Sequence, residues 1–108
     1  MNESRWEQLA DILVNYSTET VSGDRVLITM METDTWPLAR AVHAAAVGAG
    51  AHPHIEFQST LLQRDLMRGG NPELFDNSHE LQEKGMHWAD VYIAVSYTHL
   101  TLPTILLV

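Results

Sequence analysis

The sequence predicts an α/β fold with a small parallel sheet, and the clearest evidence lies between residues 25 and 57. The apolar run 26–28 follows a turn signal, Ser22-Gly23-Asp24, as the start of a strand does. A helical pattern occupies residues 35–48, and a second strand carries Ile55 and Phe57. Two strands joined through a helix pair in parallel, with a right-handed crossover.

The central helix has recognisable start and stop signals. Thr35 can cap it, and Pro37 suits the first turn because the missing N–H has no partner there. Either Gly48 or Gly50 can adopt the left-handed conformation that ends helices. Its small apolar residues share one face and should be buried: Leu38, Ala41, Val42, Ala45 and Ala46.

Helices are expected on either side of this unit. Residues 3–16 form the first, with an apolar stripe of Trp6, Leu9, Ala10, Leu13 and Tyr16. After the second strand, a short helix contains Leu61, Leu62, Leu66 and Met67, and residues 68–72 break it. One helical turn is expected at 72–75. Ser78 then caps a further helix that reaches Trp88 or Ala89, with Leu81 and Met86 on its inner face.

The third strand, 91–95, is apolar throughout, as expected for a strand covered on both faces. We expect the three strands in the order 2-1-3, as in half of a Rossmann-like or flavodoxin-like fold. Such a sheet has two open edges, which proteins usually cover or extend. The chain is therefore expected to be part of something larger or to pair with another chain.

Composition limits the function. A chain of 108 residues has room for one domain, and its net charge of −8 disfavours nucleic acid and anionic membranes. It has no cysteine, which suits the cytosol, and no signal peptide is visible at its start. Residues 91–108 are low in charge, but Pro103, His99 and several Ser/Thr residues argue against a membrane span.

Ligands of open α/β sheets bind beyond the carboxyl ends of the strands, here residues 31–35. Glu32 and Asp34 bring negative charge to the start of the central helix, where they suit its dipole and would oppose a phosphate. Gly48 and Gly50 lie at the wrong end of that helix for a dinucleotide fingerprint, and we interpret them as structural.

His52, His54 and Glu56 alternate along the second strand and share a face, so they could hold zinc. The alternative is ordinary hydrogen bonding, because no fourth ligand is visible. His79 and Glu83, like Glu80 and Glu83, fit a solvated helix face, and the isolated His43 and His87 fit core or surface histidines. Trp6, Trp36 and Trp88 fit packing positions, and no Ser/His/Asp set emerges.

The residues alone thus predict an α/β module with no assembled active site. Two functions remain open on this basis. One is a stand-alone binding module for a small ligand, of the flavodoxin-like or Rossmann-like kind. The other is an interaction protein whose sheet edge pairs with a partner.

Several short motifs, in order, resemble one enzyme family. Residues 9–17 run Leu-Ala-Asp-Ile-Leu-Val-Asn-Tyr-Ser, and 21–28 run Val-Ser-Gly-Asp-Arg-Val-Leu-Ile. Ala49-Gly50-Ala51-His52-Pro53 and Trp88-Ala89-Asp90-Val91-Tyr92-Ile93 follow. Together they resemble the N-terminal part of the aminopeptidase T/aminopeptidase S family of metallopeptidases, over about residues 9–95.

The resemblance implies a cytosolic, homodimeric exopeptidase that removes N-terminal residues from peptides with two divalent metal ions, Zn, Co or Mg. In that family the Glu, His, Tyr and Asp ligands lie in a later domain, whose motifs this sequence lacks. The resemblance therefore assigns no catalytic, cofactor-binding or metal-binding residue here. It implies a fragment of a hydrolase that is inactive alone.

The resemblance ends at Val95. Residues 96–108, which begin Ser-Tyr-Thr-His-Leu-Thr-Leu-Pro-Thr, resemble translated sequencing-adapter read-through. Residues 105–108 form an apolar run typical of an aggregation liability. We therefore expect an α/β domain at 1–95 and a non-native tail at 96–108.

Overall fold

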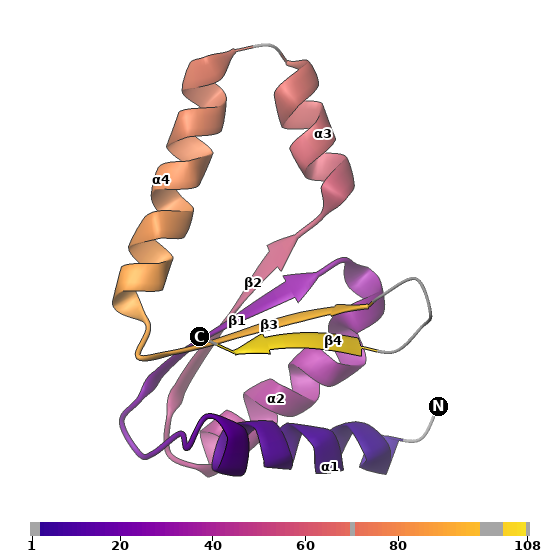
Figure 1. Cartoon of the computed structure of the whole chain (residues 1–108), viewed down its shortest axis with the longest axis vertical. Coiled ribbons are helices and arrows are strands. Elements are labelled where there is room, and N and C mark those ends of the chain that lie inside the picture. Colours follow the sequence, from indigo (N-terminus) through magenta and orange to yellow (C-terminus); the bar gives the residue numbers. More distant parts are fainter. Residues whose placement is uncertain (1–2, 70, 98–102, 108) are drawn as a thin grey trace.

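The computed structural model describes residues 3–69, 71–97 and 103–107 of the chain (Figure 1). The helices are α1 (Glu3–Ile12), α2 (Trp36–Gly48), α3 (Thr60–Arg68) and α4 (Pro72–Trp88). The strands are β1 (Arg25–Met31), β2 (His52–Gln58), β3 (Val91–Tyr97) and β4 (Pro103–Leu107). A π-helical turn, Leu13–Ser17, extends α1, and a 3-10 turn, Thr33–Thr35, precedes α2.

The sheet has the order β2-β1-β3-β4. β1 pairs in parallel with both β2 and β3, which confirms the α/β class and the predicted order 2-1-3. The fourth strand was not predicted. It pairs antiparallel with β3, so that Val95 lies opposite Ile105. The predicted tail contributes this strand, while 98–102 and 108 lie outside the described residues.

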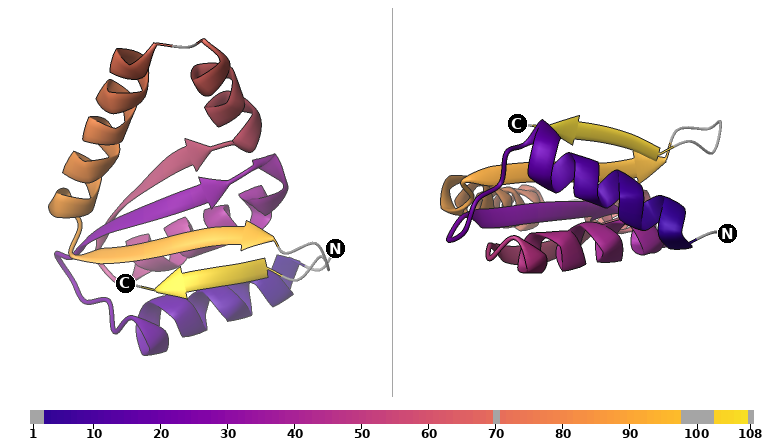
Figure 2. Two further views of the ribbon diagram at one scale, coloured as in Figure 1. Left: turned by 45° about the horizontal axis from the view of Figure 1, so that its top comes forward. Right: turned by 90° about the horizontal axis from the view of Figure 1, so that it is seen from below.

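One hydrophobic core joins α1 and α2 to a single face of the sheet (Figure 2). β1 and β3 turn alternate residues toward this face, among them Val26, Ile28 and Ile93, because side chains alternate along a strand. The apolar face predicted for the central helix is confirmed. Its residues Leu38, Val42 and Ala46 are fully buried, with Ala41 and Ala45 partly buried beside them.

The apolar stripe of the first helix is mostly buried, but Tyr16 is exposed. Tyr16 lies in the π-helical turn, where Thr18 N–H donates to Leu13 O at 3.0 Å. Hydrogen bonds between residues five apart change the angle between successive side chains. The three- and four-residue spacing of buried positions in an α-helix therefore no longer holds here. Val14 occupies the buried position instead.

The helix that leads back to β3 differs from the prediction. Pro72–Trp88 is one continuous helix, capped by the Asn71 side chain, which accepts from Glu73 N–H at 3.0 Å. Ser78 lies inside this helix and does not start a second one. The residues predicted to face inward, Leu81 and Met86, are exposed. α4 lies against the sheet near its C-terminal end, at Gly85, and extends away from the sheet toward its N-terminal end (Figure 1).

Candidate functional site

The first candidate site is the carboxyl end of β1, where ligands of open α/β sheets bind. Glu32 follows the strand with φ 68° and ψ 159°, a conformation that glycine adopts far more readily than other residues. Its backbone N–H donates to Gln58 O at 2.8 Å, which ties the end of β1 to the end of β2.

The Glu32 carboxylate binds groups at the start of α3. The sequence had suggested instead that it would lie at the start of α2. It accepts from Thr60 N–H at 2.6 Å, from Thr60 Oγ1 at 3.2 Å and from Ser59 Oγ at 3.3 Å. The hydroxyl of Thr35, predicted to cap α2, instead donates to Glu32 O at 3.0 Å and makes no cap bond. These groups hold loops in place and leave a carboxylate where a phosphate would bind.

Glu32 makes stability depend on pH. The hydrogen bond from Thr60 N–H, aided by the Thr60 and Ser59 hydroxyls, holds the Glu32 pKa below its ordinary value. The unfolded chain then binds the proton more readily than the folded chain does. The hydrogen bonds to ionised Glu32 therefore stabilise the fold above the ordinary glutamate pKa. It is lost as the pH falls through the lower pKa of the folded state.

When the pH is lowered from about 7 to about 3, we therefore expect the free energy of unfolding to fall less for the Glu32→Gln variant than for the parent chain. Urea unfolding at each pH measures this difference. Glu83→Gln, on the exposed surface of α4, is the matched control and should follow the parent curve. Parallel curves for Glu32→Gln and the parent would contradict the assignment.

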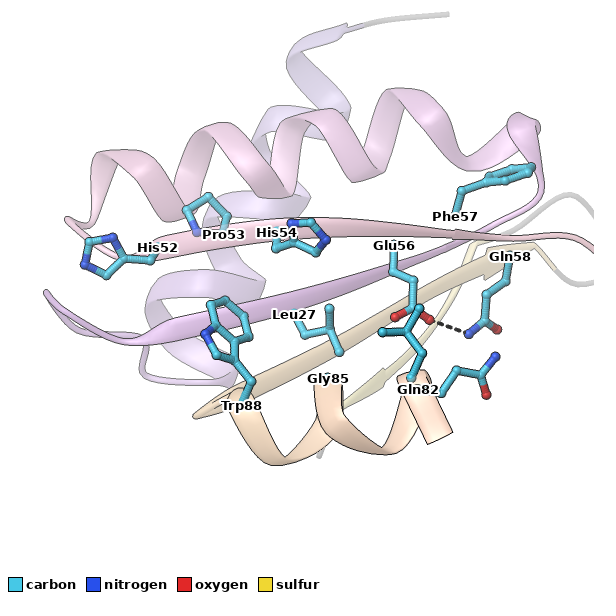
Figure 3. Close-up of a pocket in the computed structure, with 11 residues that line it drawn as sticks. Leu27, His52, Pro53, His54, Glu56, Phe57, Gln58, Gln82, Gly85 and Trp88 are labelled. Carbon is cyan, nitrogen blue, oxygen red and sulfur yellow. Dashed lines mark hydrogen bonds between the residues drawn. The ribbon is translucent and has the colours of Figure 1, made fainter. Parts of the chain in front are cut away.

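The second candidate site is the polar row on β2. His52, His54 and Glu56 do share one face, as predicted, and they lie along a cleft between β2 and α4 (Figure 3). The His54 ring meets Trp88 edge-on, with 6.5 Å between ring centroids. The Glu56 carboxylate accepts from Gln58 Nε2 at 2.8 Å.

This row does not fit a metal ion. Among the described residues, no group of three His, Asp or Glu side chains could hold one. A metal site needs three or four donor atoms, each within about 2.2 Å of one ion, and the described side chains of this row do not form such a group. His79, Glu80 and Glu83 are exposed on α4, His87 is exposed near its end, and His43 is half-buried on α2.

The cleft has a volume of about 590 Å³. Leu27 and Pro53 contribute apolar surface from the sheet, and Leu81, Gln82 and Gly85 line it from α4. α4 lies against the sheet at Gly85, where an added Cβ would lie 3.5 Å from Leu27 Cδ2 and 3.7 Å from Glu56 Oε2. Toward its N-terminal end, α4 extends away from the sheet (Figure 1).

The opposite end of the sheet carries a third cluster that the sequence did not reveal. Asp90 Oδ2 accepts from Arg25 N–H at 2.9 Å and from Arg25 Nε at 3.4 Å, and Asp90 N–H donates to Arg25 O at 2.8 Å. The Arg25 guanidinium lies 5.9 Å from the centre of a Trp88 ring. The hydrogen bonds from Arg25, backbone N–H first, hold the Asp90 pKa below its ordinary value.

This cluster joins the start of β1 to the start of β3, so its role is to align strands. Of the three tryptophans, Trp6 is buried in the core as predicted, whereas Trp36 and Trp88 are half-exposed or nearly so. No local signal marks the contact between Arg25 and Asp90, because these residues are far apart in sequence.

None of the described helices is both long and apolar enough to cross a membrane.

Comparison with known proteins adds one finding. The sequence model of a family described as thermophilic metalloprotease (M29) matches residues 2–102. No curated protein sequence matches the chain. The match covers nearly the whole chain, including all three parallel strands and the clusters around Glu32 and Arg25.

Proposed function

This chain belongs to the M29 family of thermophilic metalloproteases, and we propose that it is the N-terminal part of a metal-dependent aminopeptidase. The metal ligands of that enzyme would lie in another part of the polypeptide. The observation that carries the proposal is a contrast. The family match spans residues 2–102, yet the described residues contain no group of side chains that could hold a metal ion.

Metal-dependent peptide hydrolysis needs several ligands in fixed geometry and outer groups that orient them. The described residues of this chain do not fit such a centre, so we assign no hydrolytic step to them. Their proposed role is to support the part of the enzyme that carries the metal ions. The whole enzyme would be a cytosolic homodimer that uses Zn, Co or Mg to release N-terminal residues from peptides.

The proposal includes a boundary near residue 95. Residues 1–95 would be native to the enzyme, and residues 96–108 would not. The family match ends at residue 102, so the boundary lies inside the matched range. Resequencing the source locus tests this part: a genomic reading frame that leaves this sequence after Val95 supports it, and one that encodes residues 96–108 contradicts it.

We expect no release of chromogenic product when this chain is incubated with aminoacyl p-nitroanilides and Co²⁺, Zn²⁺ or Mg²⁺. The physical reason is that no described group of side chains could bind and activate a hydrolytic water. A trace of activity that separates from the chain on a second column would be a contaminant. Activity that copurifies with the chain and is lost in the His54→Ala variant would overturn the proposal.

A further inference from the structure

The β2 edge of the sheet is open. β2 is the terminal strand in the order β2-β1-β3-β4, so among the described strands it pairs on one side only. An unpaired edge presents a row of backbone donors and acceptors that can bind another extended chain. In Figure 1, this edge faces the space between α3 and α4.

The register identifies which backbone groups face outward. His52 N–H donates to Asp24 O at 2.7 Å, and Gln58 O accepts from Glu32 N–H at 2.8 Å. In a parallel pair, every second residue directs both its N–H and its C=O to the same neighbouring strand. The even-numbered residues of β2 therefore bond to β1. Ile55 and Phe57 therefore direct N–H and C=O outward. Pro53, whose nitrogen has no hydrogen, occupies the same outward register, as proline on an edge strand does.

Helices form walls beside this edge. The cleft of about 590 Å³ lies between β2 and α4, and a second cleft of about 240 Å³ lies between the end of β2 and the two helices. Leu62 and Leu66 of α3 line the second cleft, and Leu81 and Trp88 of α4 line the first. Leu62, Leu81 and Trp88 are among the exposed apolar side chains, and they could pack against side chains of an added strand.

The charge of the two clefts indicates what the added strand would carry. Among the side chains that the structure describes, Glu56 is the only acidic one that lines them, and no lysine or arginine does. Its side chain is half-buried, and Oε2 faces the bare backbone of Gly85 (Figure 3). Adjacent strands lie about 4.8 Å apart, so a lysine or arginine opposite Glu56 could reach its carboxylate.

We propose that β2 binds an extended peptide, which adds a strand to the sheet and places a basic residue beside Glu56. Backbone hydrogen bonds to Ile55 and Phe57 supply affinity, and the clefts supply selectivity for apolar side chains. This inference goes beyond the proposed function, because binding at β2 needs no metal ion. It can hold or fail independently of the peptidase assignment.

The test is fluorescence anisotropy with a blocked, fluorescein-labelled peptide of about six residues, a usual strand length. The probe alternates valine with threonine and has one central lysine. Two matched probes change one property each: one has glutamate in place of lysine, and one has N-methyl groups on alternate backbone nitrogens. We expect saturable binding of the lysine probe, and binding about tenfold weaker or worse for both matched probes.

Variants locate the site. Phe57→Pro removes an outward N–H without removing a bond to β1, and binding should weaken about tenfold. Phe57→Ala keeps that N–H and should weaken binding less. Glu56→Gln should abolish the preference for lysine over glutamate, whereas Glu83→Gln, on α4 outside both clefts, should preserve it. Far-ultraviolet circular dichroism checks that each variant folds.

Three results would overturn the proposal. The first is no binding of the lysine probe. The second is equal binding of the N-methylated probe, or equal weakening by Phe57→Pro and Phe57→Ala, because the backbone edge would then play no part. The third is a dimer in sedimentation velocity that Phe57→Pro dissociates and the probe does not, because a second copy of the chain would then occupy the edge.

Discussion

Replacing Leu38 by alanine is expected to lower the free energy of unfolding by about 2–5 kcal/mol, the range for buried leucines. Leu38 lies on α2 and is fully buried in the core between the helices and the sheet. Truncation removes its apolar contacts and leaves a cavity that neighbours such as Ile28 and Val42 fill only in part, since interiors are close-packed. Because domains are stable by only about 5–15 kcal/mol, this loss is large.

Urea unfolding followed by circular dichroism measures this change. Leu62→Ala is the matched control, because it deletes the same atoms from a side chain on α3 that is 57% exposed. It should change the stability by no more than about 0.5 kcal/mol. Equal losses for the two variants would mean that α2 does not pack on the sheet as described.

Replacing Gly50 by alanine is expected to be the second most damaging change. Gly50 has φ +80° and ends α2 in a Schellman motif: Gly50 N–H donates to Val47 O at 3.0 Å and Ala51 N–H donates to Ala46 O at 3.0 Å. An alanine in this left-handed conformation costs about 1–2 kcal/mol. Its Cβ would also lie 2.9 Å from Ser22 Oγ, which must then move.

We expect a net loss of about 2 kcal/mol for Gly50→Ala, because crowding adds to the backbone cost. Gly48→Ala is the matched control. Gly48 is the last residue of α2, and an added Cβ there meets nothing within 4 Å. This change should stabilise the chain by up to about 0.5 kcal/mol, the lower end of the difference between glycine and alanine in the middle of a helix. Thermal unfolding of the two variants should therefore shift in opposite directions.

Gly50 also explains one of the motifs on which the family resemblance rests. In Ala49-Gly50-Ala51-His52-Pro53, Gly50 reverses the chain, and its C=O accepts from Gly23 N–H at 2.9 Å. His52 then starts β2, and Pro53 takes a register position where no N–H is needed. The motif is therefore a structural link from helix to edge strand, and its histidine is not placed as a ligand among the described residues.

Local patterns predicted the class and strand order because each signal acts over a few residues. The apolar run in β1, the helical spacing in α2 and the glycine after it are such signals. The same reasoning was wrong for Leu81 and Met86. Their spacing is typical of a buried helix face, but both side chains are exposed, because no local pattern reports where a helix lies in space.

The candidate site was predictable only in part. Alternation along β2 correctly placed His52, His54 and Glu56 on one face, because a strand has a fixed period of two. The use of Glu32 by α3 could not be predicted, since it depends on a bond to Thr60 across the loops after β1 and β2. For the same reason the contact between His54 and Trp88 has no sequence signal.

Calorimetric titration of this chain with Zn²⁺ or Co²⁺ shows whether its own residues hold the metal ions. We predict no saturable binding at a fixed stoichiometry, and no difference between the parent chain and a His52→Ala/His54→Ala variant. Saturable binding of a pair of ions that is lost in that double variant would contradict this prediction, because His52 and His54 of β2 would then be metal ligands.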